Sequence, residues 1–114
     1  MPKLESFTVR LRTGQRAPSA PPTYVINGFL VEFDKTSGAA KPGEVYEATG
    51  EPGSFPHSLL LCGPKEGAWD IDEVSVTYHC HGEDAYTIRL GAVTLDDASD
   101  LNIWYERPAP VFDV

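Results

Sequence analysis

Two acidic segments contain the residues whose types and spacing best suit binding chemistry. Residues 69–73 and 96–100 contain six carboxylates and no Lys or Arg. Calcium is bound by several oxygen ligands, and loops at one end of a β-sandwich can supply carboxylates and backbone carbonyls. The spacing therefore predicts a calcium site or a contact for a basic partner. The alternative is two solvated acidic turns. The residues concerned are Asp70, Asp72, Glu73, Asp96, Asp97 and Asp100.

A pair of histidines forms a second candidate site. Residues two apart on a strand point to the same face, so the imidazoles of His79 and His81 can approach one transition-metal ion. This pair supports an alternative function, a small β-barrel that is a metal-dependent enzyme or a ligand carrier. The competing interpretation is two solvent-exposed polar side chains on a strand.

Two tryptophans are candidate ligand-binding residues. Trp69 adjoins the first acidic segment, and Trp104 alternates with an apolar set, so it faces outward if that set faces the core. An exposed indole beside an acidic rim can stack on a sugar or anchor a protein partner. The alternative is a strand covered on both faces. Cys62 and Cys80 each end or close an apolar run, which favours two buried thiols over a disulfide.

The sequence contains none of the common catalytic motifs. There is no Gly-x-Ser-x-Gly elbow, no phosphate-binding glycine loop and no His-Glu-x-x-His. We therefore expect binding and not catalysis. The expected partner is a protein, or a small-molecule or carbohydrate ligand.

The apolar residues alternate with period 2, which is typical of β-strands with one buried face. Glycine and proline, 20 residues together, break the chain into short segments. The runs between Tyr24 and Phe33 and between His57 and Cys62 are more continuously apolar, as central strands covered on both faces would be. The other predicted strands are Ser6–Thr13, Val74–His81, Ala85–Leu90 and Leu101–Tyr105, with Glu44–Ala48 as a weaker candidate.

One predicted hairpin brings the two acidic segments together. A short loop at Gly82-Glu83-Asp84 joins two alternating strands. Pairing Cys80 with Tyr86 matches apolar with apolar residues along the strands, and a bulge is expected near Gly91. Residues 69–73 and 96–100 then lie side by side at its open end.

These elements predict one domain over residues 1–114, an antiparallel β-sandwich of six to eight strands. The alternative is a small β-barrel. Because exposed edge strands are a common site of pairing between copies, a homodimer is also plausible on sequence grounds.

Charge and hydropathy exclude several classes of function. The net charge is −8, and the positive charge is concentrated in residues 1–16, which contain four basic residues and one acidic. Nucleic-acid binding depends on cationic contacts with phosphates, so this acidic body is a poor candidate for it. No apolar run approaches the ~20 residues of a membrane helix. The first residues lack the apolar region of a secretory signal, so we expect a cytoplasmic protein.

Overall fold

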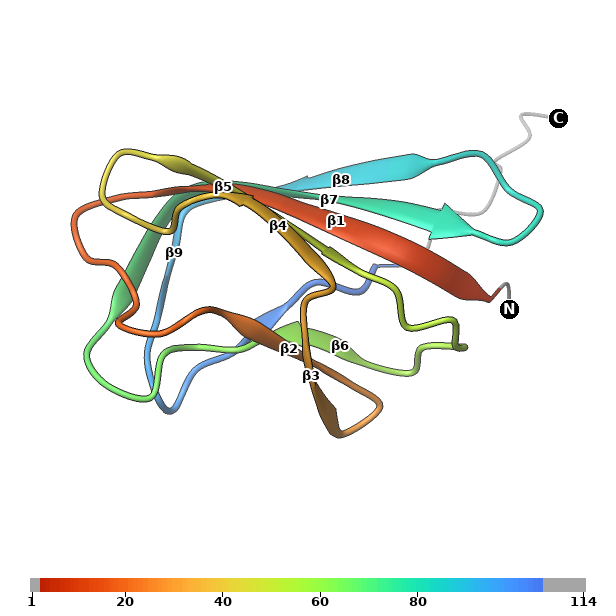
Figure 1. Cartoon of the computed structure of the whole chain (residues 1–114), viewed down its shortest axis with the longest axis horizontal. Helices are drawn as coiled ribbons and strands as arrows, with labels where there is room; N and C mark the ends of the chain where they lie inside the picture. The colour runs from red at the N-terminus through yellow and green to blue at the C-terminus, as the bar shows by residue number, and fades with distance from the viewer. Residues whose placement is uncertain (1–2, 106–114) are drawn as a thin grey trace, which may run out of the picture.

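The alternating apolar pattern builds two antiparallel β-sheets that pack face to face (Figure 1). The structure is a computed structural model that describes residues 3–105, and over this range it contains ten strands and no helix. This confirms the predicted β-sandwich. Sheet A has the order β4 (Lys35–Gly38), β5 (Val45–Gly50), β1 (Leu4–Thr13), β7 (Trp69–Cys80) and β8 (Tyr86–Leu90), and β9 (Val93–Leu95) also pairs with β7. Sheet B has the order β10 (Leu101–Asn102), β6 (Leu59–Leu61), β2 (Thr23–Ile26) and β3 (Phe29–Glu32).

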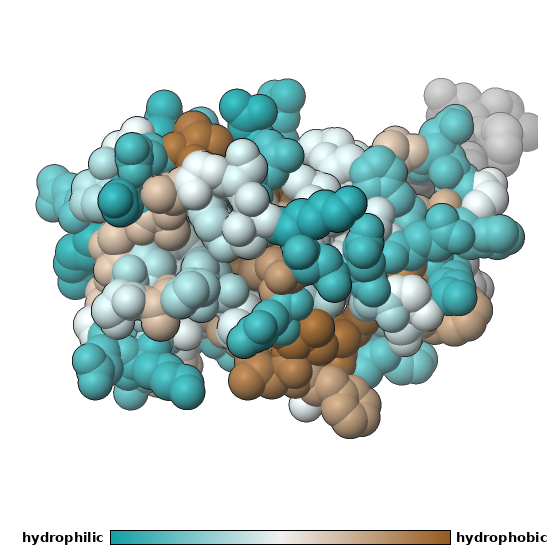
Figure 2. All heavy atoms as spheres, viewed as in Figure 1, coloured by the Kyte–Doolittle hydropathy of each residue, from teal (hydrophilic) through white to brown (hydrophobic). Residues whose placement is uncertain are grey.

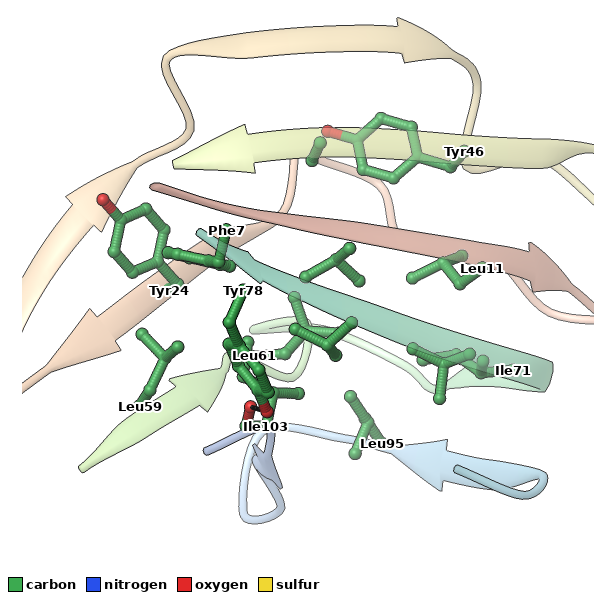
Figure 3. Packing of buried hydrophobic residues seen from close by; sticks show 14 of the residues in the cluster. Phe7, Leu11, Tyr24, Tyr46, Leu59, Leu61, Ile71, Tyr78, Leu95 and Ile103 are labelled. Carbon is green, nitrogen blue, oxygen red and sulfur yellow. Dashed lines mark hydrogen bonds between the residues drawn. The ribbon is translucent and has the colours of Figure 1, made fainter. Parts of the chain in front are cut away.

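The core fills the space between the inner faces of the two sheets (Figure 3). Phe7 of β1 meets Tyr24 of β2 edge to face, with ring centroids 4.9 Å apart, and this contact joins the sheets. Tyr78 of β7 donates a hydrogen bond to the backbone carbonyl of Ile103, which connects sheet A to the chain after β10. Because both inner faces are apolar, each sheet removes the other's buried face from water.

A bulge changes the buried face of β7 partway along the strand. Arg12 pairs with Glu73 but the next residue, Thr13, pairs with Ile71, so β7 has one extra residue there. Trp69 and Ile71 are therefore buried before the bulge, and Val74 is the next buried residue after it. In Figure 1 the start of β7 and β9 descend from sheet A toward sheet B, which closes one end of the sandwich.

Trp69 is held in the core by a polar contact as well as by packing. Its side chain is fully buried, and its Nε1 donates a 3.0 Å hydrogen bond to Oγ1 of Thr13. Thr13, at the end of β1, is the only buried polar residue among the residues that the structure describes. The tryptophan lies at the closed end of the sandwich, where β1 and β7 pair.

The β7–β8 hairpin forms, but its register is two residues from the predicted one. Tyr86 pairs with Tyr78 and not with Cys80. A two-residue shift keeps every side chain on its predicted face, so the apolar alternation cannot distinguish the two registers. The bulge expected near Gly91 is also wrong, because Val74 opposite Leu90 and Ile71 opposite Val93 keep the same register across the interruption.

The run Tyr24–Phe33 is not one central strand but the β2–β3 hairpin. Asn27 and Gly28 have φ values of 50° and 85°, the left-handed conformation that a two-residue type I′ turn requires. Ile26 consequently pairs with Phe29 across the turn. An Asn-Gly pair between apolar residues is a strong hairpin signal, and it outweighs the continuity of the apolar run.

The remaining differences concern strand number and closure. Lys35–Gly38, which none of the predicted strands covers, is β4 and pairs with β5. The weaker candidate Glu44–Ala48 corresponds to β5. Over the residues placed in the structure, neither sheet closes on itself, so the alternative barrel does not form. The same part of the chain has no helix of membrane-spanning length and apolarity.

The buried hydroxyls of Thr13 and Tyr24 provide a matched stability test. Thr13→Val leaves the buried Trp69 N–H without its acceptor, so we expect the free energy of unfolding to fall by about 1–3 kcal/mol. Tyr24 is equally buried, but its hydroxyl has no hydrogen-bond partner within residues 3–105. Tyr24→Phe should therefore leave the free energy unchanged or raise it. Urea unfolding of both variants checks this, and equal losses would contradict it.

Candidate functional site

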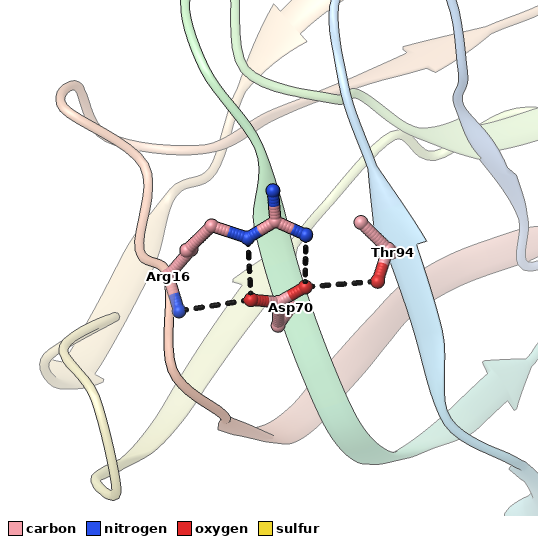
Figure 4. A network of polar contacts seen from close by, with 3 residues as sticks. All are labelled: Arg16, Asp70 and Thr94. Carbon is pink, nitrogen blue, oxygen red and sulfur yellow. Dashed lines mark hydrogen bonds and ion pairs between the residues drawn. The ribbon is translucent and has the colours of Figure 1, made fainter.

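Asp70 of the predicted acidic site is already bound by an arginine from another part of the chain (Figure 4). The guanidinium of Arg16 donates from Nε to Oδ2 at 2.8 Å and from NH2 to Oδ1 at 2.9 Å, and the Arg16 backbone N–H donates to Oδ2 at 3.0 Å. Thr94 of β9 adds a hydrogen bond to Oδ1 at 2.9 Å. These donors favour the charged carboxylate and lower the pKa of Asp70 to about 2.

The backbone positions this pair. Gly14 donates its N–H to the Asp70 carbonyl and Asp70 donates to the Arg16 carbonyl, so residues 14–16 run beside the start of β7. A Cβ on Gly14 would lie 2.6 Å from an Asp72 carboxylate oxygen, so any other residue there requires the exposed Asp72 side chain to move. Asp70, Asp72 and Thr94 line a shallow hollow of about 550 Å³ beside this segment.

The other carboxylates of the predicted site are divided between two places. Glu73 lies at the β7 bulge and pairs with Arg12 at 3.6 Å. Asp96 caps its own turn by accepting the Ala98 N–H, and Asp100 accepts the N–H of Gly63 at 2.8 Å. Asp97 is exposed on the same turn. Residues 69–71 and 93–95 do pair, as the predicted hairpin requires, but Asp96 and Asp100 lie against Gly63 and not against Asp72.

Within residues 3–105, no three His, Cys, Asp or Glu side chains converge closely enough to hold a metal ion. The Asp70 carboxylate already accepts three hydrogen bonds from Arg16 and one from Thr94, so a calcium ion ligated by Asp70 would have to displace at least one of them. Four of the predicted carboxylates, Asp70, Glu73, Asp96 and Asp100, instead form hydrogen bonds or ion pairs within the chain.

The two histidines lie at the opposite end of β7. His79 is exposed on the outer face of sheet A, and His81 follows the strand. Nδ1 of His81 lies 3.1 Å from a carboxylate oxygen of Glu5, and both side chains are largely exposed. His57, the remaining histidine, lies in the segment before β6.

Neither tryptophan stands free on the surface, because each packs against other parts of the fold. Trp69 is fully buried, so the structure places it in the core and not on a ligand-binding surface. Trp104 is half-buried and packs edge to face on Tyr78, with centroids 5.1 Å apart. Cys62 and Cys80 are also half-buried and are not bonded to each other, and burial raises the pKa of the Cys62 thiol.

An apolar surface at the β2–β3 turn was not predicted from the sequence. Phe29 is 71% exposed, Leu30 66% and Phe55 52%, and we call these three residues the hairpin patch. The Asn27 side chain joins its two parts, because Nδ2 donates to the Phe55 carbonyl and Oδ1 accepts the His57 N–H at 2.6 Å. Figure 2 shows apolar side chains gathered on the surface over β2 and β3. The Asn27-Gly28 turn was the sequence signal that places Phe29 and Leu30 on the second strand of a hairpin.

Comparisons with known proteins identify no relative. No family model matches the chain, and neither a curated protein nor a solved structure matches it.

The Arg16–Asp70 pair makes part of the stability dependent on pH. The folded-state pKa of Asp70, about 2, is below its ordinary value of 3.8. The pair therefore stabilises the fold above the ordinary value, and this contribution is lost as the pH falls through about 2. We expect Arg16→Gln to raise the Asp70 pKa toward 3.8 in a carboxyl NMR titration. Arg12→Gln, which removes the partner of Glu73 instead, should leave the Asp70 pKa in place.

A thermal unfolding scan tests the two metal hypotheses. Because Asp70 is engaged by Arg16 and the described side chains do not converge, we expect neither calcium nor zinc to raise Tm relative to chelator. A rise with calcium that Asp70→Asn abolishes would instead support the acidic site. A rise with zinc that His79→Ala abolishes would support the histidine pair.

Proposed function

We propose that the protein is a non-catalytic binding module that docks a basic, extended polypeptide on sheet B. The observation that carries this proposal is the hairpin patch. Phe29 and Leu30 are the two most exposed large apolar side chains in the part of the chain that the structure describes, and Phe55 is fixed beside their turn. Phe29 pairs with the buried Ile26 and Leu30 pairs with Val25, so the two side chains point to opposite faces of the hairpin. Exposed apolar surface is unfavourable in water and is typical of interaction sites.

Leu30 also belongs to an apolar row on the outer face of sheet B, in which Val25 and Leu60 are half-buried. The strand registers place Leu30 opposite Val25 and Val25 opposite Leu60. Their neighbours Tyr24 and Leu61 are buried in the core, so the row Leu30–Val25–Leu60 points to the other face. An outer face of an antiparallel sheet is ordinarily polar. This row therefore supports a partner that covers it.

The edge of sheet B supplies a second means of binding. β3 is the last strand of the sheet, and within residues 3–105 no further strand pairs with its outer side. Unpaired backbone groups on an edge strand can accept an extended peptide as an added strand. Backbone hydrogen bonds would then supply affinity, and contacts with Leu30 would supply selectivity.

Charge determines the kind of partner that we propose. The segments that build sheet B and its loops, residues 23–34, 51–68 and 96–105, contain one basic residue, Lys65. This surface attracts a basic polypeptide, and a second copy of the chain would bring two acidic surfaces together. The basic-partner prediction is thus retained, with the hairpin patch as its apolar anchor in place of the tryptophans. The acidic residues of these segments are Glu32, Asp34, Glu51, Glu66, Asp96, Asp97 and Asp100.

Two synthetic peptides test the proposal. An octapeptide of alternating lysine and valine should shift the backbone NMR resonances of β3 and β2, and its affinity should fall as salt is added. The alternating glutamate–valine peptide should bind at least about tenfold more weakly, since it meets an acidic surface. Leu30→Ser should weaken binding of the lysine peptide.

Val45→Ser is the matched control, because Val45 is also an exposed apolar residue but lies on sheet A. Equal losses in the Val45→Ser and Leu30→Ser variants, or equal binding of both peptides, would contradict the proposal. A dimer in light scattering that Leu30→Ser dissociates would identify a second copy as the occupant instead.

A further inference from the structure

A row of two arginines and a serine crosses the outer face of sheet A. Arg10 of β1 pairs with Ser75 of β7, and Ser75 pairs with Arg89 of β8. Residues directly opposite in antiparallel strands point to the same face, with Cβ atoms about 5 Å apart. The two guanidinium groups therefore flank the Ser75 hydroxyl, and both side chains are long enough to approach one ligand above it.

The row lines a hollow. Arg10, Ser75 and Arg89 line a space of about 350 Å³, together with Glu73 and the 41% exposed Val45. This is the size range of sites for small molecules. The β7 bulge beside Glu73 interrupts the flat sheet at one end of the hollow. At that end Gly91 leaves open space, because a Cβ there would meet no atom within 4 Å.

The two arginines of the row differ from the other arginines that the structure describes. Arg12 pairs with Glu73, and Arg16 pairs with Asp70. No carboxylate of residues 3–105 forms an ion pair with Arg10 or Arg89, although Glu47 stands opposite Arg10 in the register. Although the chain has 17 acidic residues, the N–H donors of Arg10 and Arg89 are available to a ligand.

We propose that this hollow binds an oxyanion, the phosphate or sulfate group of a small molecule, between Arg10 and Arg89. Each guanidinium presents a planar fork of N–H donors that matches two oxygens of such a group. The Ser75 hydroxyl donates a further hydrogen bond from the floor, and Val45 provides an apolar wall for the rest of the ligand. This site is independent of the hairpin patch, because the two lie on opposite sheets.

Titration with inorganic phosphate and with sulfate tests the site. Each salt is added to the ¹⁵N-labelled protein, with sodium chloride adjusted to hold the ionic strength constant. We expect saturable shifts of the Ser75 amide and of the Arg10 and Arg89 Nε resonances. Arg10→Ala and Arg89→Ala should each weaken binding about tenfold. Arg10→Lys should recover part of the affinity, because it keeps the charge and loses the fork.

Arg12→Ala is the matched control, since Arg12 lies on the same face but is paired with Glu73. Saturable binding of either ion that survives Arg12→Ala supports the site. If Arg12→Ala weakens binding as much as Arg10→Ala and Arg89→Ala do, the ions respond to the diffuse charge of the face, and the proposed site is overturned. Shifts that do not saturate with either ion would also overturn the proposed site. All three substituted positions, Arg10, Arg12 and Arg89, are exposed, and an unchanged Tm confirms that each variant is folded.

Discussion

The bulge in β7 is the constraint on which the surface and the core both depend. Without the extra residue opposite Arg12 and Thr13, the strict alternation of a strand would turn either Trp69 and Ile71 or Val74 and its successors to the outside. The bulge allows one long strand to bury its apolar side chains on both sides of the bend. It also leaves Asp72 and Glu73 exposed at the bend. The position of the acidic residues therefore follows from the packing of the apolar ones.

Alternation in the sequence was sufficient for the fold class but not for the details of pairing. It assigned the correct faces to Tyr78 and Tyr86, because a strand shows its period of two in the residue types. It could not detect a shift of two residues, since such a shift changes no face. The β2–β3 turn was predictable, because Asn27 and Gly28 have the backbone preferences of a type I′ turn. The continuous apolar composition of residues 24–33 predicts a single strand instead, and the turn chemistry outweighs it.

The candidate site was harder to predict, because its partners are distant in sequence. Arg16 and Asp70 are 54 residues apart, and no local spacing relates them. The burial of Trp69 could not be predicted either, since it depends on Thr13 at the end of another strand. By contrast, the outward position of Leu30 follows from local structure. The Asn27-Gly28 turn sets the register of β2 and β3, and this register places Leu30 opposite Val25. Short-range backbone chemistry can be read from a sequence, whereas the pairing of surface charges depends on the completed fold.

Net charge is a weak guide to local binding in a molecule with two separate faces. The acidic residues of sheet B and its loops stand on one side of the core, and Arg10, Arg12 and Arg89 stand on the outer face of the other sheet. Packed sheets are about 10 Å apart, and side chains extend the separation between the outer surfaces further. At physiological salt the screening length is about 8 Å, so each face acts on its surroundings largely independently. A chain with a net charge of −8 can therefore attract a cation on one sheet and an oxyanion on the other.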